Sequence, residues 1–501
     1  MIYKELYEAK NGSLIPIFAS GKPVHSKYNP QKEAETLINN IQPGDFFVIL
    51  GIGAGFFISE ILKKYPDSKI IAVEETEEDL VFLKNNFPTV KNFENTKNIQ
   101  FSVFNTFHEV LLKNYIPAIY SNFEFYALPS WALENPEKTK KLIEILGQTL
   151  EIIKKDFSVQ AHFGKIWTKN ILQNLGICKN EKLPAFPLKK TAVICAAGPS
   201  LEKNLQKLQK QSEDSYIIAT DTAYKILLRN KIRIDAVYSV DGQYISINHF
   251  MKNTEQNPLF VFALSGNHSI AKKLQQKNNK VIFAASQNPL EQLACLFNKE
   301  AFIEADTSSG TVTVAAVDFA KKIGFKNIEI YGADFSYPYH KAYSKGSYLD
   351  DIYQLNQFRN QNYETAFSKL VFRTELIINS DKIPSTEILN FYRDQLYNWA
   401  EKNNCKISKV NELYTIIVQN SGSQKFTEVS EFDKIKFKNY IKNNAKKLFL
   451  QPNLQNELVY ALLPLISSLK FSDTKKGCIK SFDTYLKNAL NFIIRNTEKY
   501  E

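Results

Sequence analysis

The residues of this sequence that are best suited to hold an anion lie in the run Val193-Ile194-Cys195-Ala196-Ala197-Gly198-Pro199-Ser200-Leu201. An apolar stretch typical of a β-strand stops there at small residues, and an amphipathic, basic segment over 202–211 follows. Small residues let a ligand approach the backbone, and Ser200 could cap the new helix. The N–H groups and the positive dipole end of a helix start suit a phosphate. The run matches neither a Walker loop nor a GxGxxG fingerprint, so an ordinary strand-to-helix turn is the other interpretation.

A second anion-binding turn is predicted at Asp306-Thr307-Ser308-Ser309-Gly310-Thr311. It precedes a segment of small and apolar residues, 312–320, that is typical of a helix. Consecutive hydroxyls and a glycine at a helix start can bind a phosphate through side-chain and backbone groups. Serine and threonine also cap helices, and capping is the alternative interpretation.

These turns need a scaffold, and the sequence from residue 191 onward predicts a parallel sheet. Short apolar runs of strand character alternate with helix-length or loop segments at 191–196, 216–220, 236–240, 259–264, 280–284 and 327–331. Such alternation is typical of a largely parallel sheet covered on both faces. Ligands of these sheets lie beyond the carboxyl ends of the strands. Small or polar residues follow four of the predicted strands, namely Ala197 to Ser200, Asp221 with Thr222, Asp241, and Gly332 with Asp334.

The N-terminal part of the chain predicts a smaller βαβ unit. A buried-strand run, 46–50, is followed by Gly51-Ile52-Gly53-Ala54-Gly55, a helical stretch over 57–65 and a strand over 69–73 that ends at Glu74-Glu75. An acidic residue about twenty positions after a glycine loop holds a ribose hydroxyl in dinucleotide folds. The segment resembles motif I of methyltransferases as much as a dinucleotide fold. A Rossmann-like scaffold without a ligand is the interpretation that we favour.

The net charge, the cysteines and the lengths of the apolar runs exclude several classes of protein. The 501 residues carry a net charge of +11, and residues 431–501 contribute +6 of it from 13 basic and 7 acidic side chains. No finger, RNP-like or basic-zipper pattern accompanies this charge, so nucleic-acid binding is not expected. Five scattered cysteines, no secretory segment and no apolar run of about 20 residues favour a reduced, cytoplasmic setting.

The predicted fold class is α/β. We expect a Rossmann-like N-terminal domain (1–125), a helical connector (126–186), a central parallel-sheet α/β domain (187–415) and a basic, helical C-terminal domain (416–501). A long helix is predicted over 149–176, and the chain is expected to become helical and polar beyond Val410.

Three segments resemble, in this order, the motifs of bacterial sialyltransferases that use CMP-activated nonulosonic acids: Ala196-Ala197-Gly198-Pro199-Ser200-Leu201, Thr307-Ser308-Ser309-Gly310 and Ile330-Tyr331-Gly332-Ala333-Asp334-Phe335. The central region resembles still more closely the motility accessory factor (Maf) family, flagellin glycosyltransferases that share this core. It is also similar to the archaeal 6-hydroxymethylpterin diphosphokinase group, which shares the Gly-Pro-Ser-Leu turn. The likeness to Maf proteins extends over most of the chain and implies that the central domain is the catalytic one.

The resemblance implies a set of site residues. Asp334 matches the aspartate after the glycine of the family's last core strand, and Tyr337 and Tyr343 lie near, but offset from, the tyrosines that stabilise the departing phosphate. The sialyltransferases take a catalytic histidine from a later segment, and the corresponding stretch here, 372–384, contains none. His340 is the nearest substitute as general base, beside Asp334 and Asp241. The residues implied to bind the nucleotide sugar are Ala197, Gly198, Pro199, Ser200, Asp221, Thr222, Asp241, Ser308, Ser309, Gly310, Thr311 and Gly332.

The implied activity is transfer of a nonulosonic acid from a CMP-sugar to serine or threonine of flagellin, with no metal or cofactor required. The rival enzyme is a pterin diphosphokinase that uses ATP and Mg²⁺, with Asp221, Asp241 and Asp334 as oxygen ligands. A catalytically inactive flagellin-binding protein of the same fold is the third interpretation, because the family histidine is missing. The tyrosine-rich loop 336–348 is expected to act as a lid that excludes water from the donor.

Overall fold

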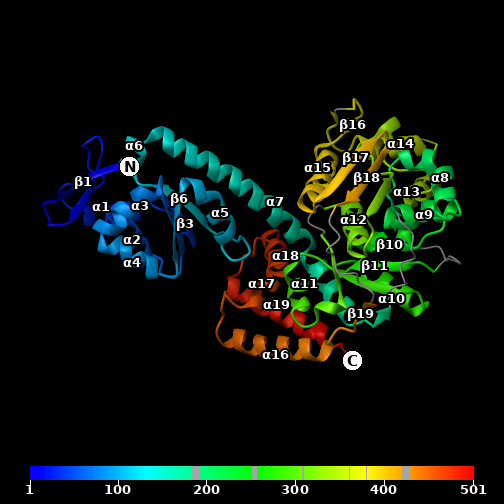
Figure 1. Cartoon of the computed structure of the whole chain (residues 1–501). Helices are drawn as coiled ribbons and strands as arrows, with labels where there is room; N and C mark the ends of the chain where they lie inside the picture. The colour runs from blue at the N-terminus through cyan, green and yellow to red at the C-terminus, as the bar shows by residue number, and fades with distance from the viewer. Residues whose placement is uncertain are drawn as a thin grey trace. The chain divides into compact units, whose positions relative to one another are not determined.

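The computed structural model of the chain describes residues 1–182, 191–250, 257–306, 310–359, 362–379, 381–419 and 428–500. The chain forms two compact units (Figure 1). Unit 1 contains Met1–Phe163 and Ile466–Tyr485, and unit 2 contains Gly164–Leu465 and Leu486–Glu501. This division is coarser than the four segments expected from the sequence, whose boundaries stay a prediction. Among the described residues, no helix combines the length and the apolar character that crossing a membrane requires.

Unit 1 is built around a four-stranded parallel sheet, as the βαβ pattern predicted. β3 (Phe46–Leu50) is buried along its whole length and pairs with β4 (Lys69–Glu74) on one side and β6 (Phe123–Ala127) on the other. β5 (Ile99–Val103) lies beside β4, which gives the order β5-β4-β3-β6. This order reverses between β3 and β6, where Rossmann-like folds open a crevice for nucleotides.

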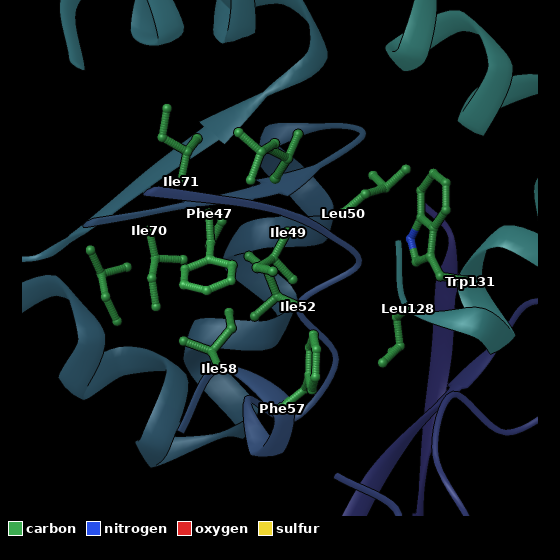
Figure 2. Close-up of a cluster of buried hydrophobic side chains, with 14 of the residues drawn as sticks. Phe47, Ile49, Leu50, Ile52, Phe57, Ile58, Ile70, Ile71, Leu128 and Trp131 are labelled. Atoms are coloured by element: carbon green, nitrogen blue, oxygen red, sulfur yellow. The ribbon is translucent and has the colours of Figure 1, made fainter. Parts of the chain in front are cut away.

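The remaining elements of unit 1 connect or precede these strands. β1 (Tyr3–Glu8) and β2 (Leu14–Phe18) form an antiparallel hairpin. The connecting helices are α1 (Pro30–Asn39), α2 (Phe56–Lys64), α3 (Glu77–Asn86), α4 (Pro88–Asn92), α5 (Phe104–Asn114) and α6 (Pro129–Glu134). Apolar side chains of β3, β4 and α2 belong to one buried core, which Figure 2 shows in close-up.

Side chains of unit 1 fill the crevice between β3 and β6. Gly51, the first glycine of the loop after β3, has a φ of +84°, and a Cβ on it would lie 2.8 Å from Cγ of Trp131. The Trp131 indole is fully buried and lies beside Leu50 at the end of β3 (Figure 2). A Cβ on Gly53 would lie 2.2 Å from Nε2 of the buried His25. The glycines therefore make room for protein side chains.

Glu74, the acidic residue that would hold a ribose in a dinucleotide fold, is also occupied by protein groups. Its carboxylate accepts hydrogen bonds from the Ile52 N–H over 2.6 Å, the Tyr3 hydroxyl over 2.9 Å and the Trp131 Nε1–H over 3.3 Å. The side chain is fully buried, and burial raises the pKa of Glu74 to about 8. This geometry supports the interpretation of unit 1 as a scaffold without a nucleotide.

Unit 2 holds a nine-stranded sheet in the order β13-β12-β11-β10-β9-β8-β14-β18-β17. Neighbouring strands from β13 to β14 are parallel, which confirms the predicted parallel sheet. Each of the six apolar runs forms a strand of this sheet. These six strands are β8 (Thr191–Cys195), β9 (Tyr216–Thr220), β10 (Ala236–Ser239), β11 (Leu259–Ala263), β12 (Val281–Ala285) and β14 (Asn327–Tyr331), and the short β13 (Ile303–Glu304) is a further strand that the sequence did not predict.

Two antiparallel strands extend this sheet beyond β14. β18 (Leu413–Val418) pairs with β14 and with β17 (Cys405–Val410). The expectation of a helical chain directly after Val410 is therefore wrong. Tyr414, Ile416 and Val418 are buried and alternate with more exposed residues, which is the period of a strand with one covered face.

Helices cover both faces of the nine-stranded sheet. Alternate residues of β8, Ala192 and Ile194, share a core with α12 (Val312–Lys322) and with Trp399 of α15 (Glu387–Lys402). α8 (Ser200–Gln211) contacts β14, α9 (Asp221–Arg229) contacts β9, and neither helix belongs to that core. Both lie on the other face of the sheet, away from α15 (Figure 1). α10 (His268–Gln276) and α11 (Pro289–Cys295) follow β11 and β12. This doubly covered sheet is the arrangement expected from the alternating pattern.

The long predicted helix is present and extends further than expected. α7 runs over Pro136–Leu175, compared with 149–176 in the prediction. A Cβ on Gly164 would lie 1.8 Å from Pro464 O, so α7 approaches the backbone of α18 closely. The helical C-terminal region is confirmed as α16 (Lys434–Leu450), α17 (Glu457–Ala461), α18 (Leu463–Thr474) and α19 (Phe482–Thr497).

Candidate functional site

A cavity lies where the order of the nine-stranded sheet reverses. β8 pairs in parallel with β9 on one side and with β14 on the other. At the carboxyl ends of β8 and β14 there is a cavity of about 310 Å³, which we call the first cavity. Open α/β sheets bind ligands at this position, and the volume falls in the range of small-molecule sites. Of the residues expected to bind the donor or act on it, the first cavity is lined by Ala197, Gly198, Thr222, Thr311, Gly332, Asp334, Tyr337 and Tyr343.

Two glycines let the turns after β8 and β14 fit into each other. A Cβ on Gly198 would lie 2.5 Å from both Asp334 Oδ2 and Gly332 O, and one on Gly332 would lie 2.2 Å from Ala196 O. Gly332 also has a φ of +71°, which other residues rarely adopt. The Gly198 N–H donates to Gly332 O over 2.8 Å. Both glycines line the cavity as expected. However, a side chain is excluded at these positions because the turns after β8 and β14 contact each other closely.

Asp334 occupies the N-terminus of α8, where the sequence predicted a phosphate. The Ser200 N–H donates to Asp334 Oδ2 over 2.9 Å. α8 begins at Ser200, and Pro199 is the N-cap residue, so the expectation that Ser200 caps this helix is wrong. Burial raises the pKa of Asp334, although the bond from the Ser200 backbone opposes that shift. The negative charge that favours this helix end is therefore supplied by the protein itself.

Threonines also cap α9 and α12, two further helices that begin at the cavity. Thr220 precedes α9, accepts from the Ala223 N–H over 3.3 Å and donates to Cys195 O over 3.2 Å. Thr311 precedes α12 and accepts from the Thr313 N–H over 3.4 Å, in agreement with the capping interpretation of this turn. Gly310, with a φ of +69°, is exposed beside it. Thr307, Ser308 and Ser309 lie outside the described residues, so their contact with the donor stays a prediction.

Two phenols and a guanidinium group line the first cavity together. Burial raises the pKa of Tyr343 to about 12 and also raises the pKa of Tyr337, so both hydroxyls keep their protons at neutral pH. Arg373 opposes both shifts, which places its charge near the two phenols. It is the one basic side chain in the described lining of this cavity. Arg373 was not predicted as a site residue, although it lies in the stretch 372–384 where the family resemblance implies a histidine.

Asp221 and Asp241 do not line the first cavity as the structure describes it. Asp221 is buried and accepts from the Ser239 hydroxyl over 2.8 Å and from the Thr222 N–H over 2.7 Å. Asp241 accepts from the Gln243 N–H over 2.8 Å, and burial raises its pKa. Both carboxylates therefore bond to their own neighbourhood, and the expectation that they contact the donor directly gains no support.

A buried histidine that the sequence analysis overlooked lies near these aspartates. The His249 ring packs edge-on against Tyr348, with 4.4 Å between ring centroids. Burial lowers the pKa of His249, and the charges of Asp221 and Asp241 act in the opposite direction. No distinctive pattern of neighbouring residues marks His249 along the chain.

A second cavity, of about 800 Å³, adjoins the first, and Tyr343 lines both. His340, the predicted base, lines the second cavity and is not among the described lining of the first. Ser344 fixes the loop between them, because its N–H donates to Ala197 O over 2.8 Å and its hydroxyl to Gly198 O over 2.6 Å. The loop expected to act as a lid is bonded to the β8 turn in this structure.

Residues 167–340 match the family model described as 6-hydroxymethylpterin diphosphokinase MptE-like. The central region is therefore similar to this family. Two uncharacterised proteins of Treponema pallidum (strain Nichols) are similar to parts of this chain. One is 39% identical to it over 134 residues, and the other is 40% identical to it over 96 residues. These matches cover 26% and 19% of this chain, and 64% and 34% of the two relatives, less than two thirds of either.

The fold as a whole is similar to a solved structure, that of a MAf glycosyltransferase from Magnetospirillum magneticum AMB-1. The TM-score is 0.57 at 11% sequence identity, over 99% of this chain and 86% of that one. Together with the MptE-like match, this confirms the resemblance inferred from the sequence motifs. At this identity the likeness establishes the fold alone.

Proposed function

We propose that this protein is a cytoplasmic glycosyltransferase that moves a nonulosonic acid from a CMP-sugar to serine or threonine hydroxyls of flagellin, for flagellum assembly and motility. The sugar would be of the sialic, pseudaminic or legionaminic type. The observation that carries the proposal is the first cavity, where Arg373 lies with Tyr337 and Tyr343 at the reversal point of a glycosyltransferase fold. Nucleotide sugars bind at such a point through their phosphate and ribose groups.

The chemistry of the leaving group accounts for these three side chains. As the bond from the anomeric carbon to CMP breaks, negative charge develops on the departing phosphate. Hydrogen-bond donors that are already in place stabilise this charge and lower the barrier. The protonated phenols of Tyr337 and Tyr343 and the guanidinium of Arg373 are such donors. Asp334 is bonded to the start of α8, so we assign it to holding the turn in position.

The experiment that tests this proposal measures binding first and transfer second. CMP and CMP-N-acetylneuraminic acid should raise the melting temperature without added metal, because a ligand of the native state stabilises it. Arg373→Ala should reduce that shift, whereas Arg359→Ala, which changes an exposed arginine outside both cavities, should retain it. Flagellin co-expressed with the protein and a CMP-sugar pathway should gain the mass of a nonulosonic acid. Absence of both the shift and the added mass would refute the proposal.

A pterin diphosphokinase-like activity is the second candidate, and the MptE-like match favours it. It would transfer a diphosphoryl group from ATP to a hydroxyl with Mg²⁺. Asp221 and Asp241 lie near each other and could hold the ion together with phosphate oxygens. Asp334, expected as a third ligand, is bonded to Ser200 instead, and the described residues contain no metal-holding group of three His, Cys, Asp or Glu side chains. A thermal shift with ATP and Mg²⁺, but not with CMP, would favour this activity.

An inactive flagellin-binding protein of the same fold remains the third proposal. It predicts that flagellin binds without gaining mass, even when a CMP-sugar is supplied. Co-purification of unmodified flagellin, together with the absence of a CMP-induced thermal shift, would favour it.

A further inference from the structure

The two cavities of unit 2 meet at one side chain. Tyr343 lines both of them, and its neighbour Ser344 is bonded to the backbone of Ala197 and Gly198. A ligand in the second cavity would therefore lie across a single ring from a ligand in the first. Two sites that share a wall suit two substrates between which a group is transferred, because proximity supplies much of the rate of such a reaction.

The charges of the second cavity differ from those of a phosphate site. Its acidic residues Glu202 and Glu364 balance its basic residues Lys341 and Lys345. Lys341 Nζ lies 3.6 Å from Glu202 Oε2, and the backbone N–H of Lys345 donates to Glu202 Oε1 over 2.6 Å. Because the two lysines in the lining are balanced by two glutamates, this cavity offers no excess of positive charge for a nucleotide.

The neutral side chains of the second cavity suit a polypeptide. Gln354 and Gln357 carry amides, and Ser368 a hydroxyl, that can bond to peptide N–H and C=O groups. Tyr363 and Phe367 pack together, with 4.8 Å between their ring centroids, and offer apolar contact. The lining thus combines the two kinds of contact that a peptide chain makes.

Apolar side chains next to these glutamines in the sequence are exposed to solvent. Leu355, at the end of α13 (Tyr348–Leu355), is 84% exposed, and Phe358 is 71% exposed. Exposed apolar side chains of this size, adjacent in sequence to lining residues of the cavity, can contact a polypeptide that reaches beyond it.

His340, the predicted base, belongs to the second cavity. His340 lines the second cavity, and both it and Tyr339 have a positive φ, of +55° and +57°. Residues other than glycine rarely adopt this conformation, and strain of this kind concentrates at functional sites. The His340 N–H donates to Tyr337 O over 3.0 Å, and Lys203 bonds to the Tyr339 hydroxyl, which holds the strained segment in place.

We propose that the second cavity is the acceptor site and takes an extended polypeptide segment that presents a serine or threonine hydroxyl. This inference rests on the proposed transferase function. In the reaction, the hydroxyl oxygen bonds to the anomeric carbon of the sugar in the first cavity. The bond from that carbon to the CMP oxygen breaks, CMP leaves with the electron pair, and His340 takes the hydroxyl proton.

Blocking the second cavity from an exposed position tests the proposal. Ser368 lies on α14 (Tyr363–Val371), is exposed and lines the cavity, so Ser368→Trp fills it without disturbing a buried core. Lys369→Trp, at the next, exposed position of the same helix and outside both cavities, is the matched control. We expect Ser368→Trp to lower the transfer rate to flagellin on the order of 10²-fold, since small displacements of a substrate cost that much. CMP affinity, measured by calorimetry, should match that of the wild type.

A second measurement does not depend on turnover. A photo-crosslinking p-benzoylphenylalanine at position 357, in place of Gln357, should attach to a flagellin segment that contains serine or threonine, and the same group at position 369 should not. Wild-type transfer by Ser368→Trp, or equal crosslinking at both positions, would overturn the assignment. Transfer to a small saccharide but not to flagellin would overturn the polypeptide acceptor. Loss of CMP binding in the wild type would instead refute the proposed function.

Discussion

The substitution Gly198→Ala tests whether the turn after β8 is shaped by protein contacts or by a ligand. The added Cβ would lie 2.5 Å from a carboxylate oxygen of Asp334 and 2.5 Å from the backbone oxygen of Gly332. The carboxylate can move, but the Gly332 oxygen moves only together with the end of β14. We therefore expect the turn to open and the bond from the Ser200 N–H to Asp334 to break.

The size of this effect follows from two contributions. Overpacking a well-filled site costs about 1–3 kcal/mol. Loss of a hydrogen bond to a charged group costs about 1.5–3 kcal/mol more. We expect unit 2 to be destabilised by about 2.5–6 kcal/mol in total, with the amides of α8 exchanging faster than in the wild type.

Urea denaturation, with hydrogen exchange followed by mass spectrometry, measures this effect for each unit separately. In an Asp334→Ala background the same substitution should cost less, because one of the two obstructing atoms is gone and the helix cap is already lost. A Gly198→Ala protein that keeps wild-type stability and α8 protection but loses CMP affinity would refute the reasoning. That result would mean that Gly198 serves the ligand directly.

Three further predictions address the cavities and unit 1. Arg373→Ala should raise the Kd for CMP, measured by calorimetry, by about 10-fold or more, because the loss of one hydrogen bond to a charged group weakens binding by that factor. An unchanged Kd would contradict the assignment of Arg373 to the phosphate. His340→Ala should slow transfer to flagellin by about 10²-fold or more while CMP affinity stays the same, and an equal loss of both would contradict its role as base. Burial raises the pKa of Glu74 from 4.5 to about 8, so the folded state holds this proton more tightly than the unfolded chain. The free energy of unfolding of unit 1, measured by urea denaturation, should therefore fall from pH 5 to pH 8, and Glu74→Gln should remove this pH dependence. A wild-type free energy of unfolding that does not change over this pH range would contradict the prediction.

The strands of unit 2 were predictable because each is a short apolar run that must be buried. The alternation of such runs with helices also indicates the sheet edge at which the polar residues gather, and the first cavity lies there. Sequence patterns do not indicate which distant segments of the chain contact each other. Ser200 and Asp334 are 134 positions apart, and nothing in either motif indicates that one carboxylate fills the helix start that a phosphate was expected to occupy.

The glycine loop of unit 1 shows the same limit. Its spacing matches a nucleotide loop, but Trp131 and His25, from other parts of the unit, fill the space above it. Arg373 was missed for a different reason. The family resemblance implies a histidine as base in that stretch, whereas the proposed leaving phosphate would require a positive charge, which arginine supplies.

The interlocking of Gly198 and Gly332 has a consequence for how the sequence of this protein can vary. Read along the chain, the two glycines belong to separate motifs that look free to change one at a time. In space, each lacks a side chain so that the backbone of the other loop can fit. A larger residue at either position meets main-chain oxygen, which no substitution at the other position can remove. The two motifs therefore have to be kept together. Moving one of them into a related protein without the other would disrupt the contact between the turns after β8 and β14.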